Sequence, residues 1–142
     1  MARPRVHLLA TAVVVGLLRR RLTWPQQLVV LAVGVLIDAD HLIDYLLFRQ
    51  AGRRRWVVLP LHGWEYGLAL LLSDQLGRWS GLARAAALGL IFHLLLDLAT
   101  NRPADPALYS VVYRLHHRFA AARLRPGGGG GAWVHQPWWR WL

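Results

Sequence analysis

The stretch Leu36-Ile37-Asp38-Ala39-Asp40-His41-Leu42-Ile43-Asp44-Tyr45 decides how the chain has to fold, because it places four ionisable side chains inside an apolar segment. The residues around it are predominantly apolar from about position 28 to position 48. Burying such groups in protein or lipid is costly unless they are paired or bind a metal ion. A helix that carries this cluster therefore needs a cation, and the remaining ligands must come from elsewhere in the chain.

The composition favours a membrane protein of one domain. Of the 142 residues, 56% are hydrophobic and only 17% are charged, and the mean hydropathy is +0.30. Soluble domains carry about 25% charged residues. The net charge of +10 comes from arginines that cluster between apolar runs, which is typical of loops beside membrane helices. We therefore expect no specific nucleic-acid binding, and the absence of cysteine excludes thiolate metal sites and disulfides.

Four apolar segments run through residues 6–18, 24–48, 56–76 and 82–100. They predict an all-α fold, a membrane-embedded bundle of about four transmembrane helices, followed by an amphipathic helix over residues 107–124. The first segment is short, since a span needs roughly 20 residues, so we expect it to be tilted or shielded by its neighbours. Residues 1–125 form the predicted domain, and residues 126–142 form a glycine-rich linker and a tail rich in tryptophan and arginine.

The distribution of arginine predicts the orientation in the membrane. With four spans and the N-terminus inside, twelve of the 17 arginines lie on the inner side and five on the outer side. The positive-inside rule then places both termini in the cytoplasm of a bacterial cell, with the chain integral to the inner membrane. Membrane lipid is accordingly an expected partner.

The polar residues of the apolar segments are predicted to meet at one side of the membrane. His7 begins the first segment, and Asp38 to Asp44 end the second. His62 and Glu65 come early in the third segment, while His93 and Asp97 come late in the fourth. Because the spans alternate in direction, all of these residues fall in the same leaflet. Each pair alone could be a structural hydrogen bond, but three such pairs at one level indicate a site.

The spacing and the residue types indicate a metal site. His93 and Asp97 are four residues apart, and His62 and Glu65 are three apart, so each pair is expected to share a helix face. Imidazole and carboxylate ligands from facing helices suit one or two ions of Zn²⁺, Mn²⁺ or Fe²⁺, with Zn²⁺ favoured. The predicted metal ligands are His7, Asp38, His41, His62, Glu65, His93 and Asp97.

The roles of three carboxylates stay open in the sequence. Asp38 or Asp40 is the natural bridge between two ions, and Asp38 is preferred as the ligand because it shares a face with His41. Glu65 or Asp40 is the candidate for a further ligand or a general base, and these two are the predicted catalytic residues. Asp44 is expected to orient a histidine from outside the ligand shell. Arg102 and Arg114 are candidates for holding a phosphate.

The order of these motifs resembles a known family. His7, then Asp38-Ala39-Asp40-His41, then His62, then His93-Leu-Leu-Leu-Asp97 is similar to the inner-membrane-associated metal-dependent hydrolases, whose best-known branch is described as LexA-binding. The resemblance covers roughly residues 5–101. It implies a metal-dependent hydrolase in the inner membrane. More distantly, the helical His and Asp spacing is similar to zinc-dependent phospholipases C and nucleases, which implies phosphoester substrates.

The third motif departs from the family pattern. The common form of the block is His-Arg-x-x-Thr-His-Ser, whereas this chain reads His62-Gly63-Trp64-Glu65. Either Glu65 replaces the second histidine as a ligand, or the chain is a divergent sub-branch with another substrate.

Two classes of function remain in competition. The first is a membrane-bound metal-dependent hydrolase that acts on a phosphoester or lipid-linked substrate at the cytoplasmic face. The alternative is a non-enzymatic membrane protein that binds or transports cations, since intramembrane His and carboxylate groups also mark ion pathways. Haem ligation by two histidines is disfavoured, because His41, His62 and His93 each have an acidic neighbour.

Overall fold

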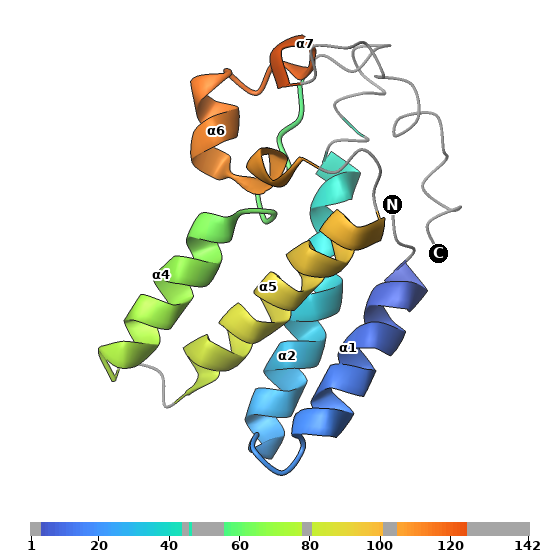
Figure 1. Ribbon diagram of the computed structural model, residues 1–142, viewed down its shortest axis with the longest axis vertical. Coiled ribbons are helices and arrows are strands. Elements are labelled where there is room, and N and C mark those ends of the chain that lie inside the picture. The colour runs from blue at the N-terminus through green and yellow to red at the C-terminus, as the bar shows by residue number, and fades with distance from the viewer. Residues whose placement is uncertain (1–3, 44–45, 47–55, 78–80, 101–104, 125–142) are drawn as a thin grey trace.

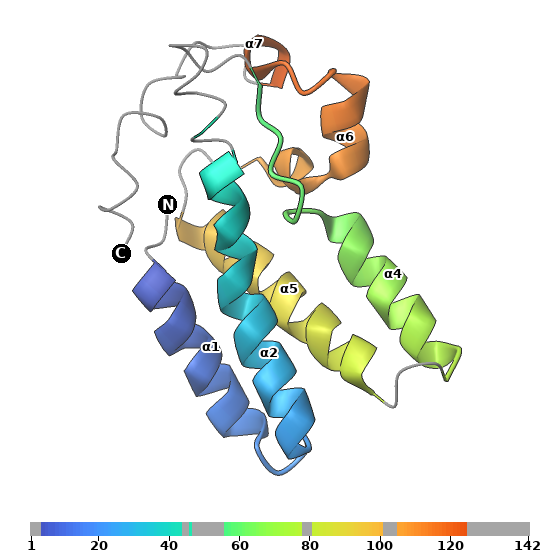
Figure 2. The same ribbon diagram turned by 180° about the vertical axis from the view of Figure 1, so that it is seen from behind.

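The computed structural model describes residues 4–43, 46, 56–77, 81–100 and 105–124, and every regular element within these ranges is a helix. The body consists of α1 (Pro4–Leu18), α2 (Trp24–Leu36), α4 (Trp64–Gln75) and α5 (Leu82–Thr100). Helix α2 packs against α1 and α5, and α5 packs in turn against α4. The helices therefore follow the order α1, α2, α5, α4 across the bundle, as Figures 1 and 2 show from opposite sides. The all-α prediction is confirmed.

The second helix changes its geometry where the acidic cluster begins. Its start is stabilised by Gln26, whose Oε1 accepts a hydrogen bond from the backbone N–H of Thr23, and by Pro25 in the first turn. At Ile37 the chain tightens into the 3₁₀-helix η1 (Ile37–Asp40) and then remains helical to Ile43. A 3₁₀-helix has three residues per turn, so positions 38 and 41 come directly above one another.

The third apolar segment does not become helical where the sequence predicted. The helix α4 begins at Trp64, eight residues later than expected, because Pro60 lacks a backbone N–H and Gly63 is extended at the N-cap with φ −145°. Before the helix, Trp56 forms an isolated antiparallel bridge with Ala120. His62 therefore lies in a connecting segment rather than on a helix face.

The predicted amphipathic helix over residues 107–124 is also wrong as a continuous element. The structure has the 3₁₀-helix η2 (Pro106–Tyr109) and the short helices α6 (Val111–His116) and α7 (Ala121–Leu124). The break follows from Arg118 and Phe119, which have φ values of +53° and +55°, outside the right-handed helical region. The predicted linker and tail at 126–142 lie outside the described residues.

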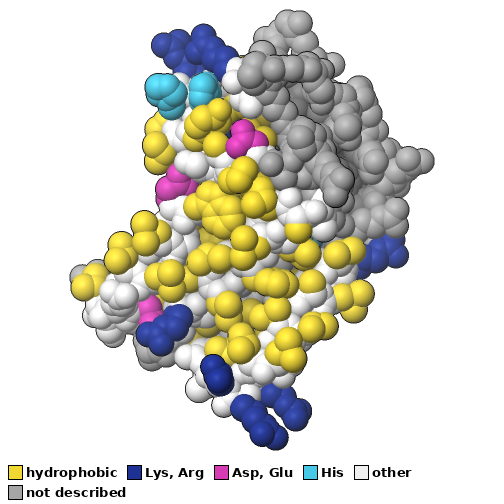
Figure 3. All heavy atoms as spheres, viewed as in Figure 1, with side chains coloured by type: hydrophobic (Ala, Val, Ile, Leu, Met, Phe, Trp, Pro, Cys, Tyr) yellow, Lys and Arg dark blue, Asp and Glu magenta, His cyan; other side chains and the backbone are white. Residues whose placement is uncertain are grey.

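Two helical stretches are long and apolar enough to cross a membrane, namely residues Trp24–Ile43 and Leu82–Thr100. Only 22% of the first stretch is buried within the protein, whereas the core helix of a soluble protein is mostly buried. Large apolar side chains are also exposed on the outer helices, among them Leu9, Val13 and Leu17 on α1 and Leu68, Leu71 and Leu72 on α4. Figure 3 shows hydrophobic side chains over one face of the bundle, with arginines gathered near its ends.

Two apolar clusters hold the bundle together. Val15, Val30 and Ala85 join α1, α2 and α5 in the half remote from the acidic cluster. Ile37, Leu90, Leu94 and Tyr109 pack together at the other half and tie η2 to the bundle. The second cluster lies beside the polar residues that the sequence singled out, and it keeps the elements that carry them in fixed relation.

Candidate metal centre

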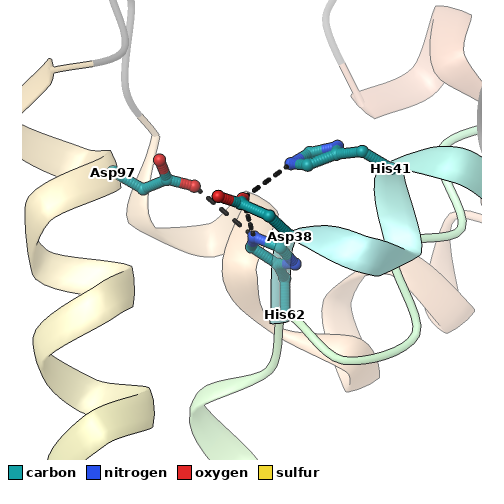
Figure 4. A group of neighbouring side chains, drawn as sticks. All are labelled: Asp38, His41, His62 and Asp97. Atoms are coloured by element: carbon teal, nitrogen blue, oxygen red, sulfur yellow. Dashed lines mark ion pairs between the residues drawn. The ribbon is translucent and has the colours of Figure 1, made fainter. Parts of the chain in front are cut away.

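Six of the seven predicted ligands meet at one end of the bundle. They come from the beginning of α1, from η1 and the residue after it, from the segment before α4, and from the end of α5. They form two groups, and within each group the potential ligand atoms all lie within 4.8 Å of one another. The groups are Asp38, His41, His62 and Asp97 (Figure 4), and His7, His93 and Asp97. Asp97 belongs to both groups.

In the carboxylates of Asp38 and Asp97, each of the two oxygens faces a different imidazole ring. Asp97 Oδ1 is 3.3 Å from Nε2 of His7, while Asp97 Oδ2 is 3.5 Å from Nε2 of His62. Asp38 Oδ1 is 3.5 Å from Nε2 of both His41 and His93, and its Oδ2 is 3.8 Å from Nε2 of His7. Asp38 and Asp97, rather than Asp40, therefore lie between the imidazoles, and Asp97 belongs to both groups.

The second ring nitrogens of two histidines are engaged by acceptors. Nδ1 of His93 lies 2.9 Å from the carbonyl oxygen of Gly34 in α2. Nδ1 of His62 lies 3.0 Å from Oδ2 of Asp40, an oxygen that also accepts the backbone N–H of Leu61. A carbonyl and a carboxylate only accept hydrogen bonds, so both Nδ1 atoms donate. In the neutral rings both Nε2 atoms then carry lone pairs, as in histidines that bind metal.

Those two Nε2 atoms lie only 3.1 Å apart, next to the oxygens of Asp38 and Asp97. Lone pairs and carboxylate oxygens repel one another at this distance unless a proton or a metal ion lies among them. Burial lowers the pKa of His62, but the contacts of this ring with the carboxylates of Asp40 and Asp97 outweigh this effect and raise the pKa to about 9. The surroundings of His62 therefore favour a positive charge.

A second observation, the presence of buried polar atoms without hydrogen-bond partners, also indicates that the cluster fits a divalent metal ion. Among the described residues, both ring nitrogens of His7, Oδ2 of Asp38 and Oδ2 of Asp97 are buried without a hydrogen-bond partner. Buried polar atoms are rarely left in that condition. A metal ion in each group would satisfy Nε2 of His7 and Oδ2 of Asp97. The imidazole and carboxylate donors suit Zn²⁺, Mn²⁺ or Fe²⁺.

The cluster is nearly closed to solvent. The side chains of His7, His62 and His93 are 0% exposed and that of Asp97 is 2% exposed. Asp38 and His41, at 15% and 18%, are the more accessible members. A small molecule that reaches the cluster would therefore approach from the side on which these two residues lie.

Glu65 is not part of this cluster. Its Oε1 accepts hydrogen bonds from the hydroxyl of Ser110 and the N–H of Val112, and its Oε2 accepts the N–H of Val111. The carboxylate thus caps the start of α6. The expectation that His62 and Glu65 share a helix face is wrong because His62 precedes the N-cap of α4.

Asp40 also has a different place from the one predicted. Its side chain is buried and contacts Nδ1 of His62, so it lies behind this imidazole rather than in either group. This is the position of a carboxylate that fixes the tautomer and orientation of a ligating histidine. The sequence assigned that kind of role to Asp44, which lies outside the described residues, as does Arg102.

The structure adds contacts that no sequence pattern marked. Gly34 contributes only a backbone carbonyl, and Leu61 only a backbone N–H, so neither has a side-chain signal. Arg114 is fully buried, and its Nη2 donates to the carbonyl oxygen of His62. The sequence suggested a phosphate contact for this arginine, whereas the structure places its side chain against the protein backbone. His116 is exposed and His117 is half-buried on α6, and neither belongs to the two groups.

Comparisons of the chain with models of protein families, with curated proteins and with solved structures give no match. The family resemblance therefore remains an expectation from the motifs, and a function for this chain has to be inferred from the geometry of the cluster.

Proposed function

We propose that this protein is a membrane-embedded, metal-dependent hydrolase that acts on a phosphoester or lipid-linked substrate at the cytoplasmic face of the inner membrane. The observation that carries the proposal is the pair of His/Asp groups that share Asp97. Asp38 and Asp97 each turn their two oxygens toward different imidazoles, which supports a site for two ions.

The residues divide into ligands and supports. His41 and His62 would hold the first ion with Asp38 and Asp97, and His7 and His93 would hold the second ion with Asp97. Asp40 and the carbonyl of Gly34 keep His62 and His93 in the tautomer that presents Nε2. Bound divalent metal in such a site lowers the pKa of water towards 7 and polarises a phosphoryl or acyl oxygen.

The hydrolysis would join the oxygen of water to phosphorus, or to an acyl carbon, and break the bond to the leaving oxygen. The leaving oxygen takes up a proton as the water gives one up. Of the cluster residues, Asp38 and His41 are the more exposed, so they are placed to contact the substrate. Asp40, which the sequence offered as a general base, is 2% exposed and stands behind His62.

The location in a membrane is supported by the two stretches that could cross it and by the exposed apolar side chains of α1 and α4. We include all four long helices in the membrane-embedded bundle, with both termini in the cytoplasm. Because the cluster lies at one end of the bundle, it would meet the headgroup region of a membrane that these helices cross. A phosphate in that headgroup would be attracted to the metal ions.

The test uses the full-length protein purified in detergent. Elemental analysis is expected to find divalent metal in the wild-type protein and much less in Asp38→Ala. Asp74→Asn is the matched control, because Asp74 pairs with Arg84 near the turn between α4 and α5, at the opposite end. Hydrolysis of phosphomonoester, phosphodiester and lipid-linked phosphate substrates should follow the metal content. The proposal would be refuted if the wild-type protein contained no bound metal, or if Asp38→Ala contained as much metal as the wild type.

A cation-binding or transporting protein is the second candidate. It is favoured by the near-complete burial of His7, His62, His93 and Asp97, which leaves little room for a large substrate. Metal flux in proteoliposomes, without hydrolysis of any phosphate substrate, would favour this candidate over the hydrolase.

A further inference from the structure

The segment from Pro106 to Ala120 packs against the connecting segment that carries His62. The indole N–H of Trp64 donates to the carbonyl of Pro106 at 3.0 Å. The ring of Tyr109 lies over that of His62, with the centroids 6.1 Å apart. Farther along, the N–H of Val57 donates to the carbonyl of Phe119 at 2.9 Å. These contacts join two parts of the chain that are about 50 residues apart in sequence.

Both segments carry strained backbone where they meet. Leu59, which is buried, has a φ of +38°, and Arg118 and Phe119 are also positive. L-residues with side chains at these φ values cost free energy, and such strain persists only when the surrounding structure holds it in place. The carbonyl of Leu59 accepts the N–H of His62, so the strained turn bears directly on this histidine.

Glu65 and Arg114 link the two segments in opposite directions. Glu65, three residues after His62, accepts three hydrogen bonds at the start of α6. Arg114, which lies on α6 four residues after Ser110, donates through Nη2 to the carbonyl of His62. Gly63 allows this close approach, because a Cβ atom there would lie 2.6 Å from Cγ2 of Val111. The backbone of His62 is thus fixed from α6, while its ring is fixed by Asp40.

The complete burial of Arg114 indicates more than packing. Its guanidinium is 0% exposed, and burying a charge is costly unless it is well bonded. An apolar side chain would fill the same space without that cost. Among its contacts is the hydrogen bond that it supplies to the main chain of a candidate ligand, which ties this buried cation to the position of His62.

We propose that Arg114 is a positioning residue for the metal centre, which acts through the backbone carbonyl of His62, and that Glu65 sets the register of α6 from which Arg114 reaches this carbonyl. The inference rests on the proposed function, because it concerns the same metal site. It assigns to the C-terminal segment the task of holding Nε2 of His62 toward Asp38 and Asp97.

The test measures Co²⁺ binding to the full-length protein, because the visible spectrum of Co²⁺ reports ligand geometry. Arg114→Gln is expected to weaken Co²⁺ binding by about 10- to 100-fold, the range known for residues that support metal ligands. Its spectrum should also differ from that of the wild type, whereas a merely structural loss would leave the spectrum of the folded fraction unchanged. Arg114→Lys, which keeps a cationic donor, should recover part of the affinity.

The matched control is Arg123→Gln, since Arg123 is an exposed arginine in α7, and it should bind Co²⁺ as the wild type does. If Arg114→Gln does not fold, Glu65→Gln decides, with the same loss of affinity and altered spectrum expected. Wild-type affinity and spectrum in folded Arg114→Gln, or in Glu65→Gln where Arg114→Gln does not fold, would overturn the positioning role of Arg114 and leave the proposed metal centre standing. A wild-type protein that binds no Co²⁺ would instead overturn the proposed metal centre itself.

Discussion

His62 and His93 illustrate how individual hydrogen bonds prepare a side chain for a cation. Each Nδ1 donates to a fixed acceptor, Asp40 in one case and the carbonyl of Gly34 in the other. The donated proton leaves the lone pair on Nε2, and both lone pairs are directed into the same space beside Asp38 and Asp97. The chemical character of the site therefore depends on atoms that do not themselves touch a metal.

Single substitutions should separate the two groups of ligands. His7→Ala is expected to remove the ion held by His7 and His93, and His41→Ala the ion held by His41 and His62. Asp97→Asn should reduce the content of both ions, because Asp97 belongs to both groups. Elemental analysis of metal per protein checks this, with Asp74→Asn as the control. Complete loss of metal in both His7→Ala and His41→Ala would argue against two separately held ions.

At the level of helices, the backbones of α2 and α5 come into close contact at Gly89. A Cβ atom on Gly89 would lie 2.8 Å from the carbonyl oxygen of Val30 and 3.2 Å from the backbone N of Gly34. Small residues permit such contact between helix backbones, in membranes especially. His93 follows Gly89 by one helical turn, so this contact is what brings its Nδ1 to the carbonyl of Gly34.

Gly89→Ala is expected to force α2 and α5 apart and to destabilise the protein by about 1–3 kcal/mol, the usual cost of overpacking. Gly16→Ala is the matched control, since Gly16 also lies within a helix but has nothing within 4 Å of the added Cβ. Its effect should be neutral or stabilising by up to about 1 kcal/mol, from helix propensity alone. Thermal unfolding followed by circular dichroism measures both. Equal unfolding temperatures for the two variants would contradict the close crossing.

For the molecule as a whole, the packing of the helices produces both a buried polar cluster and an apolar exterior. The bundle buries His and Asp side chains at one end, while leucines and valines on α1 and α4 face outward. In water such an exterior would promote association, since soluble proteins rarely expose large apolar patches. In lipid the same exterior is solvated, and the low dielectric surroundings strengthen the attraction of the carboxylates for a cation.

The absence of cysteine allows this exterior to be probed with single labels. Val13→Cys and Leu68→Cys, at positions 62% and 60% exposed, should react slowly with a charged, water-soluble thiol reagent in lipid nanodiscs. Arg123→Cys, in the exposed part of α7, should react rapidly. Unfolding in denaturant should make all three equal. Rapid labelling of Val13→Cys and Leu68→Cys in nanodiscs would mean that these faces contact water.

Much of the fold could be predicted from the chain because its signals are local. Long apolar runs over residues 6–18, 24–48 and 82–100 predicted the helices that the structure has at 4–18, 24–36 and 82–100, with η1 continuing the second. The alternation of direction brought His7, Asp38 and His93 to one end. Spacing within a helix also held, since His93 and Asp97 lie on one face of α5 and Asp38 and His41 meet in and just after η1. These relations depend on the periodicity of the backbone alone.

Only the tertiary structure decided the roles of Asp40, Glu65 and Arg114. The spacing of three residues between His62 and Glu65 is typical of two residues on one helix face, but α4 begins after His62. The side chain of His62 contacts Asp40, whereas that of Glu65 accepts hydrogen bonds at the start of α6. Asp40 faces His62 across 22 residues, and Arg114 reaches the same residue across 52. Contacts at such separations depend on how the elements pack, and no pattern of neighbouring residues records them.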